Sequence, residues 1–248
     1  MALIVQNPLF YQNVVPLNRD AHRDLRLKPL DRPLDYARES SLIPALIDEF
    51  GAAANELAIA FLPGTGEPAA VFITGIKPGK NLVISEDGLW SGAYVPAYLR
   101  RYPFIVGDVP DSEPILCIDD AYPGFTRDDG WRLFSASGEA EPSTVQALEL
   151  AINYRAAADR TRAFSARLQE LGLFRAVTLA VEMAGEHSAT VHGLLAVDEQ
   201  SFDALPDDVI VELHRAGYLK LIFAHILSLR AVSKLTSKIS DIKILKSA

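Results

Sequence analysis

The sequence predicts an α+β protein, with an antiparallel sheet of about five strands, a second hairpin, one long amphipathic helix and C-terminal helices. Residues 56–120 contain several short β-type apolar runs, whereas residues 142–173 repeat apolar side chains every three to four positions. The strands precede the helices and do not alternate with them regularly. This order favours an α+β class over a doubly wound sheet.

The first part of the chain, residues 1–40, is expected to form an extended N-terminal arm. It holds four of the fifteen prolines, and Pro29 and Pro33 are incompatible with a long helix. Short strands are expected at residues 14–17 and 25–27. The rest of the chain, residues 41–248, is expected to form a single α+β domain. The loop 119–141 is the one candidate for a boundary within it.

The region after the arm is expected to begin with a short helix over residues 42–50, capped by Ser41. A hairpin should follow, and then further strands and one short helix between Pro96 and Pro103. We predict that residues 56–120 form one sheet, with Cys117 facing its core. Its expected strands are residues 56–63, 68–76, 81–85, 104–109 and 115–120.

The C-terminal half is expected to contain the long helix and a second hairpin. The helix should run over residues 142–173 and close at Gly172. The hairpin should pair residues 173–183 with 189–198. Two further helices are expected, over residues 201–217 and 219–235.

Composition narrows the function classes. The formal net charge of −8 over 248 residues argues against a general nucleic-acid binder. A single cysteine, Cys117, excludes an intrachain disulfide and a cysteine-based zinc site. No spaced histidine or carboxylate motif indicates a metal or a cofactor. There is no basic leader or long apolar run, so a soluble, cytoplasmic protein is expected.

The segment with the most distinctive composition is residues 92–104, GAYVPAYLRRYPF. It contains three tyrosines, two adjacent arginines and two prolines. Adjacent helical residues point about 100° apart, so at most one of Arg100 and Arg101 can face inward. The candidate ligand-binding or partner-binding residues of this region are Trp90, Tyr94, Tyr98, Arg100 and Arg101.

Two interpretations of the inward arginine are open. Among tyrosines it could clamp a carboxylate or phosphate, because its planar guanidinium is always charged and binds such groups with two hydrogen bonds. It could instead make a structural salt bridge to Asp119 or Asp120, with the aromatic side chains as core. The density of aromatic residues and arginine is also typical of interface anchors.

Several segments together give the chain a family resemblance. They are residues 92–104, VVPLN at 14–18, HRDLRLKP at 22–29, ILCIDD at 115–120 and the long stretch 193–230. Taken together, and in their order along the chain, these segments resemble the bacterial SapC-like family, which is named for a surface-layer-associated protein. The resemblance implies an association with the cell envelope or surface layer, and it brings no catalytic residues.

The C-terminal segment has its own charge pattern. Residues 219–248 contain six lysines and arginines and one acid. A basic amphipathic helix over residues 219–235 could make weak contact with an anionic membrane surface or an acidic partner. A solvated surface helix is the alternative.

The favoured function is a non-enzymatic binding or accessory protein. It would engage a protein or a small acidic ligand through residues 92–104, in connection with cell-envelope export or nutrient uptake. One alternative is a metal-independent enzyme with an arginine anion clamp, and another is an oligomeric structural component. An enzyme site should show a deep pocket with convergent polar groups, and a binding module an exposed apolar patch.

Overall fold

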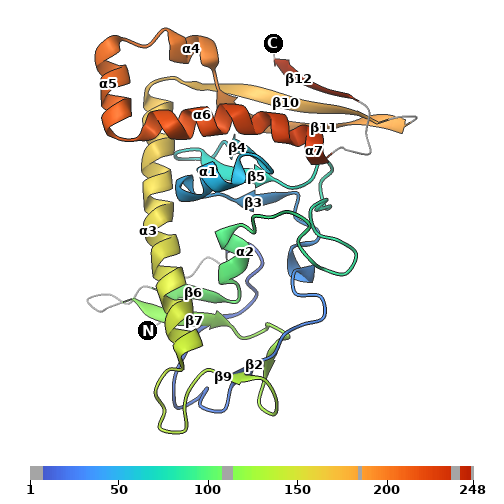
Figure 1. Ribbon diagram of the computed structural model, residues 1–248, viewed down its shortest axis with the longest axis vertical. Helices are drawn as coiled ribbons and strands as arrows, with labels where there is room; N and C mark the ends of the chain where they lie inside the picture. The colour runs from blue at the N-terminus through green and yellow to red at the C-terminus, as the bar shows by residue number, and fades with distance from the viewer. Residues whose placement is uncertain (1–7, 108–113, 184–185, 236–240, 247–248) are drawn as a thin grey trace. The chain divides into compact units, whose positions relative to one another are not determined.

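The computed structural model describes residues 8–107, 114–183, 186–235 and 241–246 (Figure 1). The chain forms two compact units, and each is described by itself. Unit 1 consists of Met1–Ala37, Glu86–Leu89 and Tyr98–Ala156. Unit 2 consists of Arg38–Ser85, Trp90–Ala97 and Ala157–Ala248.

Unit 1 contains two small antiparallel sheets. The first has the order β1 (Val14–Pro16), β7 (Ile115–Asp119) and β6 (Phe104–Gly107). The second has the order β8 (Phe125–Thr126), β2 (Arg26–Leu27) and β9 (Trp131–Arg132). The short helix η1 (Asp35–Ala37) and most of α2 (Ala97–Arg101) also belong to this unit.

The core of unit 1 is apolar and joins both sheets to the first half of the long helix α3 (Pro142–Glu170). It consists of Leu25, Phe104, Leu116, Ile118, Leu133, Phe134 and Ala151. Cys117 is fully buried, as expected for a residue that faces a core. Phe104, the last residue of the segment 92–104, which we call the signature segment, is therefore part of this packed interior.

Unit 2 contains a six-stranded antiparallel sheet. Its order is β12 (Asp241–Lys246), β10 (Phe174–Met183), β11 (Glu186–Val197), β4 (Ala58–Leu62), β5 (Ala69–Ile73) and β3 (Leu42–Pro44). Seven short helices accompany the sheet. They are η2 (Ile47–Glu49), α1 (Phe50–Ala53), α4 (Glu199–Asp203), α5 (Asp207–Arg215), α6 (Tyr218–Ser228), η3 (Leu229–Ala231) and α7 (Val232–Leu235).

Helix α6 lies beside the sheet of unit 2 (Figure 1), and buried polar contacts fix it there. The backbone N–H of Val197 donates to Nε2 of His225 at 3.0 Å, so Nδ1 of the ring carries the proton and donates to the Ile59 carbonyl at 3.1 Å. The Ile59 N–H donates to the Ser228 hydroxyl oxygen at 2.9 Å. One face of α6 is therefore tied to β4 and β11.

The α+β class, the long helix, both hairpins and the C-terminal helices are confirmed. Helix α3 ends close to Gly172, whose φ of 67° is the left-handed conformation that closes a helix. Phe164 and Leu168 of α3 are fully buried, whereas Val145 and Ile152, expected on the same apolar face, are about 40% exposed.

Three finer expectations were wrong. Residues 56–120 do not form one sheet, since β4 and β5 lie in the six-stranded sheet and β6 and β7 lie in another. Residues 81–85 form no strand, only an isolated bridge between Ile84 and Trp90. Leu42–Pro44, expected to be helical, is the edge strand β3.

Two other expected segments differ in detail. The helix expected over 201–217 is divided into α4 and α5, because Pro206 precedes the first turn of α5. Of the strand expected over 104–109, residues 108–109 lie outside the described residues.

Candidate functional site

The first half of the signature segment belongs to unit 2, where two glutamates hold it. Buried Glu49 accepts the Tyr94 hydroxyl at 2.9 Å and the Ala97 N–H at 2.7 Å. The Glu56 carboxylate accepts the backbone N–H groups of Ala93 and Tyr94 at 2.8 and 3.2 Å. The Tyr94 hydroxyl therefore has an internal partner, and the loop before α2 is anchored by charge-assisted hydrogen bonds.

Trp90 also lies in unit 2, in the bridge to Ile84. Its indole Nε1–H is buried and has no hydrogen-bond partner in the part of the chain that the structure describes. Such a donor carries a desolvation cost of about 1–3 kcal/mol. Trp90 therefore has an unused hydrogen-bonding group.

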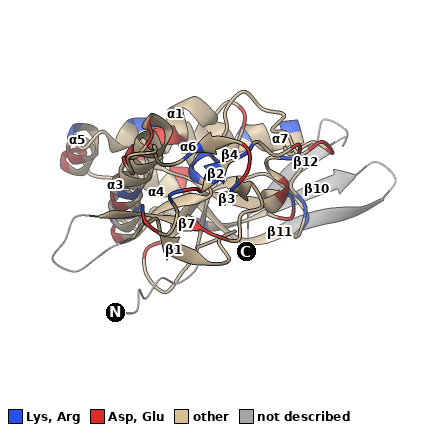
Figure 2. Cartoon of the chain, turned by 90° about the horizontal axis from the view of Figure 1, so that it is seen from below, with Lys and Arg blue, Asp and Glu red and all other residues tan. Residues whose placement is uncertain are grey.

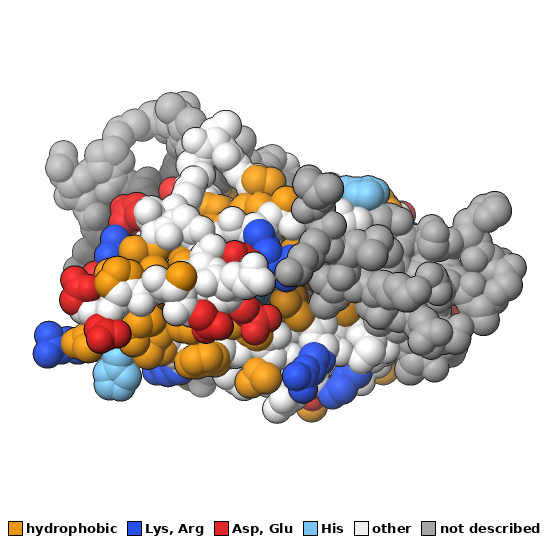
Figure 3. Space-filling view, turned by 90° about the horizontal axis from the view of Figure 1, so that it is seen from above, with side chains coloured by type: hydrophobic (Ala, Val, Ile, Leu, Met, Phe, Trp, Pro, Cys, Tyr) orange, Lys and Arg blue, Asp and Glu red, His pale blue; other side chains and the backbone are white. Residues whose placement is uncertain are grey.

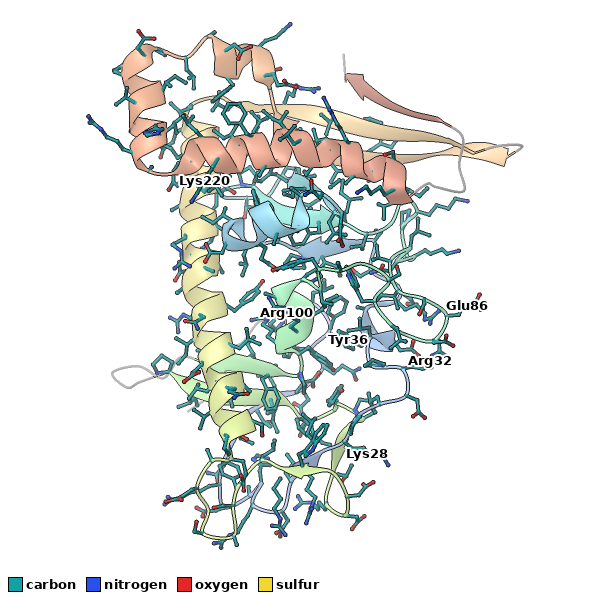
Figure 4. All side chains as sticks on the ribbon, viewed as in Figure 1. Lys28, Arg32, Tyr36, Glu86, Arg100 and Lys220 are labelled. Carbon is teal, nitrogen blue, oxygen red and sulfur yellow. The ribbon has the colours of Figure 1, made fainter. Side chains whose placement is uncertain are left out.

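The second half of the segment, in unit 1, separates the two arginines. Arg100 is exposed, whereas Arg101 is only 7% exposed. Figure 4 shows Arg100 on the short helix α2. The expectation that at most one of the adjacent arginines faces inward is therefore confirmed, and Arg101 is the inward one.

Arg101 lies among the rings of three tyrosines. Its guanidinium carbon is 4.0 Å from the ring centroid of Tyr154, 4.5 Å from that of Tyr98 and 5.6 Å from that of Tyr11. Cation–π contacts of this kind contribute from about 0.5 to about 2 kcal/mol each when desolvated. The rings come from three distant parts of the chain and converge on one cation.

Arg101 makes no ion pair with any carboxylate of the described residues, and its buried Nε–H has no hydrogen-bond partner among them. The structural salt bridge that was one interpretation is not formed with Asp119 or Asp120. Asp119 is fully buried and accepts the N–H groups of Gln12 and Asn13 at 2.9 and 2.8 Å and the Tyr102 hydroxyl at 3.1 Å. Asp120 accepts the Asn13 amide at 2.6 Å.

Neutral tyrosines do not supply the missing negative charge. Burial raises the pKa of Tyr11, of Tyr98 and of Tyr102, and for Tyr102 the buried charge of Asp119 adds to the effect. Arg101 lowers the pKa of Tyr11 and Tyr98, but burial outweighs it. These phenols therefore stay protonated at neutral pH, and Arg101 lacks a counter-ion among them.

The rings around Arg101 belong to a larger aromatic cluster, which we call the tyrosine cluster. It contains six of the eight tyrosines and Phe10, in a chain of ring contacts with centroids 4.2–5.9 Å apart. Its members are Tyr11, Tyr36, Tyr98, Tyr102, Tyr122 and Tyr154, with Phe10 between Tyr36 and Tyr98. Of these, only Tyr98 was predicted from the sequence as a site residue.

A cavity of about 290 Å³ opens beside the far end of the tyrosine cluster, where Tyr36 and Tyr122 form part of its wall. The Tyr36 ring lies 4.2 Å from the Tyr102 ring, which in turn contacts Tyr11. Arg32 and Asp35, at the rim of this cavity, pair with each other at 2.9 Å. The rim cation is therefore already matched, whereas Arg101 is not.

The described residues show neither a metal-binding cluster nor a single membrane-spanning helix. Among the described residues, no group of three or more His, Cys, Asp or Glu side chains could hold a metal ion. No single described helix is long and apolar enough to cross a membrane. Asp207–Arg215 and Tyr218–Leu235 reach that length and composition only together, across a bend of 92°.

The fold and site define an α+β protein whose signature segment places a buried arginine, with no carboxylate partner in the described part of the chain, within a tyrosine cluster. Comparison with family models gives a match to SapC over residues 17–235, most of the chain. The chain belongs to the SapC family. No curated protein and no solved structure matches it.

Proposed function

We propose that this protein binds an anionic group, a carboxylate or phosphate on a protein or a small ligand, and that Arg101 is the residue that recognises it. The observation that carries the proposal is the burial of Arg101 without a carboxylate in the described residues. Burying an unpaired charge is costly. Cation–π contacts offset part of this cost, and an external anion would offset the rest.

Access to Arg101 would be controlled by the segment that carries Tyr11. Tyr11 is 5% exposed, and its ring is one of the three around the guanidinium. The preceding residue, Phe10, has a φ of 78°, a strained conformation for a bulky side chain. A displacement of this segment would relieve the strain and uncover Arg101, and it would have to break the hydrogen bonds from the Tyr98 hydroxyl to the Leu9 carbonyl at 2.8 Å and from the Tyr11 hydroxyl to the Phe104 carbonyl at 2.7 Å.

A binding role suits these surroundings better than catalysis. The described groups next to Arg101 are phenols with raised pKa values, which are poor bases at neutral pH. A metal-independent enzyme would need a base or nucleophile beside the clamp. Family membership and the surface-layer name of the family are the basis for proposing an accessory role in envelope export or nutrient uptake, from a cytoplasmic location.

The binding test uses anions as probes. Phosphate and citrate, compared with chloride at matched ionic strength, should raise the melting temperature of the wild type. Arg101→Met should lose this anion-specific increase, whereas Arg127→Met, at an exposed site of the same unit, should keep it. An equal response of the wild type and Arg101→Met would contradict anion recognition by Arg101.

A second candidate function, weak contact with an anionic membrane surface, is favoured by one face of the helix Tyr218–Leu235. Two large apolar residues, Phe223 and Leu227, are 50% and 58% exposed there. Exposed Lys220, Arg230 and Lys234 follow the same face at helical spacing. The molecular surface seen from above carries hydrophobic, basic and acidic side chains (Figure 3).

The charge pattern limits this second role to weak binding. The face itself carries three cations and no acid. The neighbouring helix α5 has both signs of charge, with Asp207, Asp208 and Glu212 as its acids (Figure 2). Attraction to anionic lipid therefore depends on a narrow row of side chains, as in a peripheral amphipathic helix.

A further inference from the structure

A second, larger cavity lies wholly within unit 2. Arg101 and the three tyrosines around it belong to unit 1, so the two sites share no residue. Its volume is about 520 Å³, within the range of small-molecule sites. It is lined by residues of η2, α1, α3 and α6 and of the turn before α6. The contact of Phe164 with Tyr218, with ring centroids 5.0 Å apart, fixes α3 beside the start of α6.

The space exists because small residues face it. Gly51, Ala163, Ala216 and Ala224 are among the lining residues and leave room between the helices. Leu221 adds an apolar wall. The hydrogen bond from the Ile47 N–H to the Thr161 hydroxyl, 3.0 Å long and buried, holds η2 on α3. The cavity is therefore bounded by helices that are fixed to one another.

Two cations stand at the rim of this apolar space. Arg160 pairs with Asp48, and both side chains are about half exposed. Lys220 has no carboxylate partner among the described residues. Its side chain folds back beside Gly217, where its Cε would lie 3.7 Å from an added Cβ. Figure 4 shows Lys220 at the start of α6. The charges of the three lining side chains sum to a net positive rim.

We propose that this cavity binds an amphipathic anion, a medium-chain carboxylate with its apolar part against Ala163, Ala224 and Leu221. The carboxylate would lie at the rim, where Lys220 supplies an ammonium without a competing acid. An apolar chain alone would leave Lys220 unused, and a bare inorganic anion would leave the apolar wall in contact with water. Only a ligand with both an apolar chain and an anionic group matches both the apolar wall and the Lys220 ammonium.

The test is calorimetric titration of the full chain with decanoate. Saturable binding of one decanoate per chain is expected, with decanol bound at least about ten-fold more weakly because it lacks the charge. Lys220→Met should weaken decanoate binding by about ten-fold. The matched control Lys234→Met, on the same exposed face of the helix but not at the cavity, should leave the affinity unchanged.

A second variant tests the apolar part of the cavity. Ala163→Leu fills space on the α3 side and should abolish decanoate binding. If that variant does not fold, the Lys220→Met result stands alone as the test. The proposal is overturned by an absence of saturable decanoate binding, by equal affinity of the wild type and Lys220→Met, or by phosphate binding as tightly as decanoate. The Arg101→Met protein should bind decanoate normally, which separates this site from the proposed function.

Discussion

The guanidinium carbon of Arg101, on α2, lies 4.0 Å from the centre of the Tyr154 ring, on α3. The two residues are fifty-three positions apart and meet within unit 1. The ring face supplies the partial negative charge that a carboxylate would otherwise supply. This contact explains how the fold can hold an arginine that has no ion-pair partner in the described residues, and the Nε–H of Arg101, which has no hydrogen-bond partner among them, is left for an external anion.

The Arg101–Tyr154 contact should appear as a coupling energy. Tyr154→Leu removes the ring face and is expected to cost about 1–2 kcal/mol of unfolding free energy, whereas Tyr154→Phe keeps the ring and should cost less. A double-mutant cycle of Tyr154→Leu with Arg101→Met, measured by urea denaturation, should give a coupling of about 0.5–2 kcal/mol. Strictly additive effects would show that the cation does not interact with this ring.

Asp119 is expected to stabilise unit 1 as a buried carboxylate held by hydrogen-bond donors alone. Its carboxylate accepts hydrogen bonds from two backbone N–H groups and from the Tyr102 hydroxyl. In Asp119→Asn the new amide NH2 group would point at these donors, so the substitution should cost about 2–3 kcal/mol of unfolding free energy. Asp120→Asn is the control, because Asp120 is exposed, and should cost less than about 1 kcal/mol. Equal urea midpoints for Asp119→Asn and the wild type would refute this role.

His225 should make stability fall with acid. Burial lowers the pKa of His225 to about 4 from the usual 6.5, so between these values the unfolded chain binds a proton that the folded chain does not. Stability is therefore complete above pH 6.5 and falls as the pH decreases toward 4, by about 1.4 kcal/mol per pH unit at most. Unfolding free energies at several pH values should show a shallower slope for His225→Gln than for the wild type. Identical slopes would contradict a neutral, buried imidazole.

The proposed membrane contact can be measured with vesicles. The wild type should cosediment weakly with vesicles rich in phosphatidylserine and not with phosphatidylcholine vesicles, and added salt should weaken the binding. Replacing Phe223 and Leu227 together by Ser should abolish cosedimentation without a large loss of stability, because both side chains are at least half exposed. If the double variant still cosediments, this face of α6 is not the contact.

The sequence was sufficient for features that depend on local order. Pro96 and Pro103 bracket α2, Gly172 closes α3, and adjacent arginines on a helix must diverge, so one inward arginine could be predicted. It was not sufficient for features set by distant pairing. Leu42–Pro44 has apolar spacing that suits a helix, but its strand partner β5 decides otherwise, and Pro44 is tolerated because β3 is an edge strand.

The composition of the tyrosine cluster could not be predicted for the same reason. Tyr11, Tyr36 and Tyr154 reach Arg101 or its neighbours only because separate segments of unit 1 pack together. No local motif connects them to residues 92–104. The only hint in the sequence is the position of the tyrosines, seven of which precede residue 155.

The unfolding free energy of Arg101→Met, measured in urea without added ligand, tests the central claim most directly. An arginine kept for an external anion has no internal ion pair to lose, and removing its charge relieves a desolvation cost that offsets the lost cation–π contacts. The change should therefore lie between a small gain and a loss of about 2 kcal/mol. A loss of about 3–5 kcal/mol, the usual result of breaking a buried pair, would mean that Arg101 has an internal partner and a structural role.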